Sequence, residues 1–455
     1  MDGLQALLRT DILHGPVIVG AYTLSAAAVV FLLARRPTVR WLVTVAIAIA
    51  SGGVVAVLLW FFLVRVFNVF GMGLVPVTYA WLGAACAAVG IALVNLWKTR
   101  PVRRSLAAAS VLLFALTGAL GINAGYGLDR TLGALLGVNV LSPITLTAPG
   151  NHAGPRTAPP GGPGSGTGST GDPNPDRAGH ALWQTWSPPA GIPAAGNTGS
   201  QVIPNTVSGF SSRPAGVYLP PAALVPNAPA LPLVIMLMGQ PGNPDPEYVA
   251  ASLDREASQH GGLAPIVVVA DQLGDPAIDP LCLDTAKYGQ AETYLTRDVV
   301  GWAAANLNVT HDHRYWTIAG FSNGGQCAIS LAAKHPDIWS NVIDVSGESF
   351  PGSEIQDQTR NDVFGGSQAA YDAQKPVNLL AGHRYPGMFA IFTCGSGDPG
   401  VAAGQQMLVG AAQAAGMTAE YAAIPGVGHE VGALTGGLDA GFDALYPRLG
   451  LAPPP

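Results

Sequence analysis

Four long apolar runs occupy the first 128 residues of this 455-residue chain, and they restrict its fold more than any other feature. None of the runs contains Asp, Glu, Lys or Arg. They cover Pro16–Ala34, Trp41–Val64, Met72–Trp97 and Ser105–Leu128. A helix needs about 20 apolar residues to cross the core of a bilayer. One such run could be a buried core helix, but four in succession predict an α-helical transmembrane bundle of four spans within residues 1–148.

Basic residues between the runs predict the orientation of this bundle. The first loop carries Arg35, Arg36 and Arg40, the second carries only Arg65, and the third carries Lys98, Arg100, Arg103 and Arg104. Loops rich in Lys and Arg usually face the cytoplasm. We therefore expect both chain ends outside, and everything after residue 128 on the extracytoplasmic side of the plasma membrane. Because the spans lack the charged residues typical of ion paths, we interpret the bundle as an anchor.

The composition changes after the fourth run. From Pro149 to Asp176, 15 of the 28 residues are Gly or Pro. Such a segment buries too little apolar surface to offset the entropy lost on ordering it. We therefore predict a linker over residues 149–200. The whole chain has a formal net charge of -6 and no basic patch, so nucleic acid is not expected as a partner.

Strand and helix patterns alternate over residues 201–450. Six apolar runs have the length of strands: Leu231–Met238, Pro265–Ala270, Tyr315–Ala319, Asn341–Val345, Met388–Thr393 and Ala419–Ile424. Before them, Gln201–Ser208 and Gly216–Leu219 are expected to form an antiparallel pair. Phe350–Tyr385 interrupts the alternation and is interpreted as an insertion. Nearly unbroken apolar strands alternating with helices predict an α/β domain with a mostly parallel central sheet.

The pentapeptide Gly320-Phe321-Ser322-Asn323-Gly324 lies between a predicted strand and a predicted helix. This G-x-S-x-G pattern places a serine on a sharp turn at the carboxyl edge of a sheet, where its hydroxyl is accessible for nucleophilic attack. The alternative is a helix-capping serine in a glycine-rich turn. The strand–turn–helix context favours Ser322 as a catalytic nucleophile.

A nucleophilic serine of this type needs an acid and then a histidine later in the chain. Asp398 and His429 each follow a predicted strand, so both are expected at the same sheet edge as Ser322. We predict His429 as the base and Asp398 as the acid. Glu348, just after the fourth apolar run, is an alternative acid, and Asp398 is also placed to cap a turn.

The tetrahedral intermediate needs N–H donors that are already in position. One is expected to be the backbone amide of Asn323, directly after the nucleophile. The second is expected from the loop after Leu231–Met238, where we select the amide of Gln240 because Pro241 has no N–H. An ordinary Gly-Pro turn is the alternative interpretation of that loop.

These motifs resemble the putative-esterase branch of the α/β hydrolases, which includes esterase D and the actinobacterial mycolyltransferases. The resemblance covers about 55% of the chain and rests on Val217–Pro220, Gly239–Gly242, Gly320–Gly325 and Gly428-His429. It implies a triad of Ser322, Asp398 and His429, with oxyanion amides from Gln240 and Asn323. Mycolyltransferases use Glu as the acid and are usually secreted, so Asp398 and the four spans depart from their pattern.

The cysteines fit an extracytoplasmic domain. Three of them, Cys282, Cys327 and Cys394, follow the bundle, so at most one disulfide can form among them. Cys327 lies one turn into the helix after Ser322, and we expect it to pair with Cys282. No metal site is predicted, because the histidines of His311-Asp312-His313 lack a third ligand.

Together these features predict a membrane-anchored serine esterase that acts on acyl-ester or lipid substrates through an acyl-enzyme and needs no cofactor. An acyltransferase that moves the acyl chain to a sugar hydroxyl would use the same residues. A non-catalytic membrane scaffold or sensor is a third hypothesis.

Overall fold

The computed structural model describes residues 2–67, 74–97, 99–138, 140–146 and 181–454. The chain forms two compact units. The first contains Met1–Val140 and two short later segments, Gly352–Thr359 and Gly428–Val431. The second contains Leu141–Pro351, Arg360–Val427 and Gly432–Pro455. The glycine- and proline-rich segment Pro149–Asp176, which we predicted as part of a linker, lies outside the described residues.

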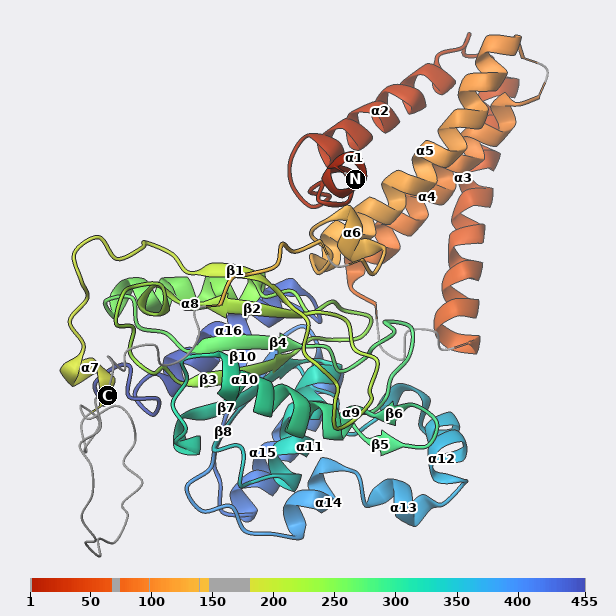
Figure 1. Cartoon of the computed structure of the whole chain (residues 1–455). Helices are drawn as coiled ribbons and strands as arrows, with labels where there is room; N and C mark the ends of the chain where they lie inside the picture. Colours follow the sequence, from red (N-terminus) through yellow and green to blue (C-terminus); the bar gives the residue numbers. More distant parts are fainter. Residues whose placement is uncertain (1, 68–73, 98, 139, 147–180, 455) are drawn as a thin grey trace, which may run out of the picture. The chain divides into compact units, whose positions relative to one another are not determined.

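Four long helices form the body of the first unit, coloured red to orange in Figure 1. They are α2 (Pro16–Leu33), α3 (Val39–Trp60), α4 (Pro76–Asn95) and α5 (Pro101–Tyr126), and α3 continues as a π-helical segment over Phe61–Val66. Each is long and apolar enough to cross a membrane, with a mean hydropathy between 1.9 and 2.6. Prolines begin three of them, at the position where the missing N–H leaves no helical bond unmade. The prediction of four apolar helices is confirmed.

A few polar contacts connect the helices of this unit. The hydroxyls of Ser25 in α2 and Thr117 in α5 share a buried hydrogen bond of 2.7 Å. At the end of α2, the guanidinium of Arg103 donates to the carbonyls of Leu32 and Ala34 at 3.2 and 3.0 Å. Carbonyls in the last turn of a helix have no partner within the helix. Arg103 therefore both satisfies the end of α2 and fixes it to α5. The short helices α1 (Asp2–Leu8) and α6 (Leu132–Leu135) complete the unit.

An eight-stranded sheet is the centre of the second unit (Figure 1). Its order is β1-β2-β4-β3-β7-β8-β9-β10. The strands are β1 (Asn197–Gln201), β2 (Ala215–Leu219), β3 (Leu233–Leu237), β4 (Ile266–Ala270), β7 (Trp316–Phe321), β8 (Asn341–Val345), β9 (Phe389–Gly395) and β10 (Thr418–Ile424). The pairs from β4 to β10 are parallel, and β1 and β2 are antiparallel. All six predicted apolar strands and the mostly parallel sheet are confirmed.

The first strand differs from the prediction. The sheet begins at Asn197 rather than at Gln201, and residues 202–208 form a loop and a turn. The carboxylate of Asp298 accepts hydrogen bonds from the backbone amides of Val207 and Ser208, both at 2.9 Å, which holds that turn. A short helix, α7 (Leu182–Thr185), precedes β1. Folded structure therefore starts within the segment 149–200 that we predicted as linker.

Helices cover both faces of the sheet, which explains why β3, β4, β7, β8 and β9 are buried along their whole length. On one face, α8 (Glu247–Gln259) and α16 (Val431–Leu445) are joined by an ion pair between Arg255 and Asp439. On the other face, α11 (Asn323–Lys334) packs against β7 and β8, and α15 (Pro399–Ala414) packs against β9 and β10. The π-helical segment Tyr294–Val299 lies between α9 (Ala291–Thr293) and α10 (Val300–Asn306).

Two additions interrupt this alternation. A two-stranded hairpin, β5 (Asp284–Thr285) with β6 (Gly289–Gln290), follows the loop after β4. The predicted insertion contains α12 (Gln356–Phe364), α13 (Gln368–Asp372) and α14 (Pro376–Ala381).

Candidate active site

Ser322 occupies a strained turn between β7 and α11. Its backbone has φ 57° and ψ -120°, a conformation that is unusual for a residue with a side chain. The Ser322 amide donates to the carbonyl of Val345 at the end of the neighbouring strand β8, at 2.9 Å. The Ser322 carbonyl accepts from the amides of Gly325 and Gln326 and so starts α11. The turn is thus held on both sides, and strain kept in this way is typical of functional sites.

The glycines of this turn are required by close backbone contacts. A Cβ on Gly320 would lie 2.0 Å from the carbonyl oxygen of Gly324, and a Cβ on Gly324 would lie 2.2 Å from the carbonyl oxygen of Leu237 in β3. No side chain fits at either position. The G-x-S-x-G pattern is therefore imposed by the tight approach of β7, α11 and β3.

The loop after β3 passes directly beside Ser322. A Cβ on Gly239 would be 3.2 Å from the Cβ of Ser322, so the backbone of Gly239 approaches the serine side chain closely. The loop closes as a turn in which the Gly242 amide donates to the Gly239 carbonyl at 2.7 Å, and the Gln240–Pro241 peptide is cis. Gln240 is exposed, whereas Asn323 is 1% exposed. The structure thus brings the predicted Gln240 loop next to Ser322 and Asn323.

Asp398 follows β9 and begins α15. Its Oδ1 accepts a hydrogen bond from the Val401 amide at 3.4 Å at the start of α15. The loop that carries Asp398 is joined to the turn after β10. The Gly397 amide donates to the Val427 carbonyl at 2.8 Å, and the Gly426 amide donates to Ser396 Oγ at 3.0 Å. Val427 is two residues before His429, so the chain segments leading to Asp398 and His429 are held together.

His429 lies between β10 and α16 and is 9% exposed. It belongs to Gly428–Val431, one of the short segments of the first unit, whereas Ser322 and Asp398 belong to the second. Glu348, the alternative acid, lies three residues after β8 and is 8% exposed. The roles of these four residues are part of the proposal made below.

A buried carboxyl group that the sequence did not suggest lies near the end of β8. Asp344 is fully buried, and its Oδ1 accepts from the Gly347 amide at 3.0 Å and from Nε2 of Gln405 in α15 at 3.2 Å. Burial raises the pKa of Asp344 to about 7, although these two hydrogen bonds act in the opposite direction. A Cβ on Gly325 would be 2.5 Å from Asp344 Oδ1, which places this carboxyl group against the first turn of α11.

Cys282 and Cys327 form a disulfide, the pair expected from the sequence. It links the loop before β5 to the first turns of α11, five residues after Ser322. Both cysteine side chains are buried. Cys394, a free cysteine, is buried in β9, and burial is the main cause that raises its pKa to about 11.

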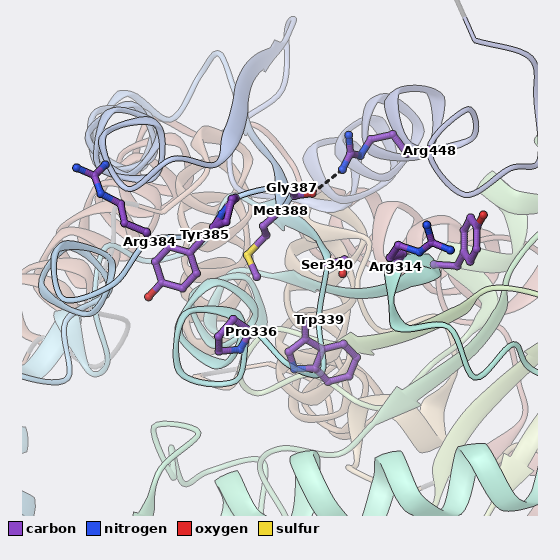
Figure 2. A pocket seen from close by; sticks show the side chains of 11 residues that line it. Arg314, Pro336, Trp339, Ser340, Arg384, Tyr385, Gly387, Met388 and Arg448 are labelled. Carbon is purple, nitrogen blue, oxygen red and sulfur yellow. Dashed lines mark hydrogen bonds between the residues drawn. The ribbon is translucent and has the colours of Figure 1, made fainter. Parts of the chain in front are cut away.

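A cavity of about 560 Å³ lies at the amino ends of the parallel strands, opposite the end that carries Ser322 (Figure 2). Its lining includes the residues just before β7, β8 and β9, and three arginines. Each guanidinium already has a partner in the protein. Arg314 pairs with Asp312, Arg384 donates to a backbone carbonyl, and Arg448 donates to the Gly387 carbonyl at 2.9 Å. We interpret these arginines as structural, because Ser322 lies at the other end of β7.

A mostly parallel sheet covered by helices, with a strained serine between a central strand and its helix, defines the class of α/β hydrolases. The family described as "Putative esterase" matches residues 211–438, and the chain belongs to this family. The second unit is therefore an enzyme domain of the carboxylic ester hydrolase type.

Two curated relatives and one solved structure show how far the similarity extends. The chain is 32% identical to an uncharacterized protein of Corynebacterium glutamicum over 57% of this chain and 62% of that protein. It is 33% identical to the putative esterase NocK of Nocardia uniformis over 29% of this chain and 38% of that protein. It thus spans less than two thirds of either relative. An S-formylglutathione hydrolase from Agrobacterium tumefaciens superposes with a TM-score of 0.48 at 19% identity, over 56% of this chain and 97% of that structure.

Proposed function

We propose that this protein is a membrane-anchored serine esterase whose catalytic domain lies on the extracytoplasmic side of the plasma membrane. The observation that carries the proposal is the strained Ser322 at the carboxyl end of β7, with the backbone of Gly239 packed against its side chain. In this proposal Ser322 is the nucleophile, His429 the base and Asp398 the acid. The backbone amides of Gln240 and Asn323 are the oxyanion donors.

The reaction proceeds in two steps, acylation and deacylation. In acylation, Ser322 Oγ forms a bond to the ester carbonyl carbon, its proton passes to His429, and the carbonyl electron pair becomes an oxyanion held by the two amides. The intermediate collapses to an acyl-enzyme, and the alcohol leaves with the proton from His429. In deacylation, water attacks the acyl-enzyme, His429 takes its proton, and Ser322 leaves with that proton as the carboxylic acid is released.

The contacts between the loops after β9 and β10 support this assignment of roles. The Gly397–Val427 and Gly426–Ser396 hydrogen bonds keep the chain segments before Asp398 and His429 side by side. An acid that orients an imidazole must be held in this way, because the imidazole needs a fixed tautomer and direction. Asp398 is retained over Glu348 as the acid because it follows β9, the strand next to β10.

The anchor and its orientation are supported by the first unit. Its four helices are each at least 18 residues long and apolar, and the basic residues lie in the first and third loops. An esterase held at a membrane surface meets esters that partition into the bilayer or the layer next to it. We therefore propose acyl esters and lipids as its substrates.

The experiment uses the full chain purified in detergent. A fluorophosphonate probe tests whether the serine is reactive, and a panel of short- and long-chain acyl esters tests turnover. Ser322→Ala should abolish labelling and lower turnover by roughly a thousandfold or more, because only the oxyanion donors and binding remain. Ser330→Ala is the matched control, since Ser330 is a buried serine in α11, the helix that begins directly after Ser322.

The outcomes are distinct. Equal thermal midpoints of the wild type and Ser322→Ala would show that the loss is chemical. A folded Ser322→Ala protein with wild-type turnover would refute the mechanism. A wild type that is neither labelled nor active on the panel would favour the scaffold hypothesis. If an added sugar lowers the yield of free acid and becomes acylated, the protein is an acyltransferase instead.

A further inference from the structure

Gln272 follows the carboxyl end of β4, beside the two segments that carry the proposed oxyanion donors. β4 pairs with β3, and β3 pairs with β7, so Ala270, Leu237 and Gly320 lie in register across three adjacent strands. The chain continues from these three positions into the Gln272 loop, the Gln240 loop and the Ser322 turn. The topology thus brings the three segments together at the carboxyl ends of adjacent strands.

The side-chain amide of Gln272 connects the other two segments. Its Nε2 donates to the backbone carbonyl of Met238, the residue that opens the Gln240 loop. The same Nε2 donates to Oδ1 of Asn323 at 3.3 Å. Gln272 is 2% exposed and Asn323 is 1% exposed, so water does not compete for these hydrogen bonds. Buried amides bonded on both sides fix the distance between the groups they join.

A second contact holds the far end of the same loop. The guanidinium of Arg213 donates to the Gly242 carbonyl at 2.9 Å and to Asn243 Oδ1 at 2.8 Å. It also pairs with the buried carboxylate of Asp271 at 2.7 Å. Because Asp271 precedes Gln272, adjacent residues after β4 hold the loop at both ends, one through Met238 and the other through Arg213.

From these contacts we infer that Gln272 is a positioning residue that sets the distance between the oxyanion donors on Gln240 and Asn323. This inference rests on the proposed function. Gln272 does not touch the reacting atoms; it acts through the carbonyl of Met238 and the side chain of Asn323. A displacement of about 1 Å in such a site costs roughly a hundredfold in rate, and one lost oxyanion donor costs roughly a hundredfold to a thousandfold in kcat.

The test is Gln272→Met in the full-length protein. Methionine keeps the length and volume of the side chain but has no N–H donor. We expect kcat to fall roughly tenfold to a hundredfold, with KM changed by less than about threefold. The pH dependence of kcat/KM should keep its midpoints, because His429 and Asp398 are untouched. Labelling by fluorophosphonate should slow in parallel, since its transition state uses the same donors.

The matched control is Asn341→Ala, at the amino end of strand β8, away from the carboxyl ends that carry Ser322 and Gln272. Asn341 is also fully buried, and its amide donates to the carbonyls of Arg314 and Trp316 at 3.0 and 3.1 Å, joining β8 to the start of β7. Its loss should lower the thermal midpoint while kcat stays within about twofold of the wild type. A purely structural role for Gln272 predicts the same behaviour for Gln272→Met.

The results separate the two proposals. If Ser322→Ala is inactive but Gln272→Met keeps the wild-type kcat, the inference about Gln272 is wrong and the esterase proposal stands. If Gln272→Met raises KM and leaves kcat unchanged, Gln272 contributes to substrate binding and the inference is also wrong. If the wild type neither hydrolyses esters nor reacts with the probe, both proposals fall.

Discussion

Asp344→Asn should change how the stability of the protein depends on pH. Asp344 is completely buried between the start of α11 and α15, and among the residues that the structure describes only Gly347 and Gln405 donate to its Oδ1. Its Oδ2 is buried and has no hydrogen-bond partner among the described residues. An ionised carboxylate in such a place is costly, so burial raises the pKa from 3.8 to about 7. Asparagine has nearly the same shape but cannot ionise.

The sign and size of the effect follow from this pKa. Between pH 4 and pH 7 the folded protein keeps the Asp344 proton, whereas the unfolded chain releases it. The free energy of unfolding therefore falls as the pH rises through this window. The interval from 3.8 to about 7 corresponds to about 4 kcal/mol. For a domain of this size that is on the order of 10 °C in thermal midpoint.

The assay compares the thermal midpoints of the wild type and Asp344→Asn, as full chains in the same detergent, from pH 4 to pH 8. The two should be similar near pH 4, and Asp344→Asn should become the more stable protein as the pH approaches 8. Asp284→Asn is a control, because Asp284 is an exposed carboxylate outside the sheet core. A midpoint difference that does not change with pH would refute the reasoning.

Four further results are expected. Asp398→Asn should lower turnover by a few powers of ten while probe access remains; a mild Asp398→Asn with a severe Glu348→Gln would reverse the assignment of the acid. Non-reducing peptide mapping should recover Cys282 joined to Cys327. Replacing both with alanine should lower the free energy of unfolding by up to about 4 kcal/mol, because the bond closes a loop of 45 residues. A reporter fused after Pro455 should be active only outside the cytoplasm; a cytoplasmic signal would reject the topology.

The parts of the fold that bury continuous apolar surface were predictable from the sequence. β3, β4, β7 and β8 are covered on both faces, so most of their side chains are apolar and their runs stand out in the sequence. β1 was placed wrongly because Asn197–Gln201 has no apolar run. It is a strand because it pairs with β2, and pairing with a distant segment leaves little trace in the local sequence.

The turn that carries Ser322 was predictable for a different reason, which also explains why the buried Gln272 and Asp344 were missed. Gly320 and Gly324 are demanded by contacts within a few residues of Ser322 and with one adjacent strand, so the requirement appears as a local motif. The partners of the Gln272 side chain lie 34 and 51 residues away, and Gln405, the side-chain partner of Asp344, lies 61 residues away. Nothing in their neighbouring sequence distinguishes them from ordinary loop or strand residues.

The burial of these polar side chains is therefore visible in the structure but not in the sequence. In the sequence, a Gln or an Asp beside a strand predicts a solvated loop, because such side chains are usually exposed. In the fold, the carboxyl ends of β4, β3, β7 and β8 lie next to one another. Polar side chains at these ends are shielded from water and must form hydrogen bonds within the protein. A buried amide such as that of Gln272 then has few alternative partners, so it holds neighbouring loops at fixed positions. The catalysis that we propose for Ser322 needs N–H donors that are in place before the substrate arrives. In this proposal the local motif supplies the nucleophile, and these long-range polar contacts supply the fixed surroundings in which it can react.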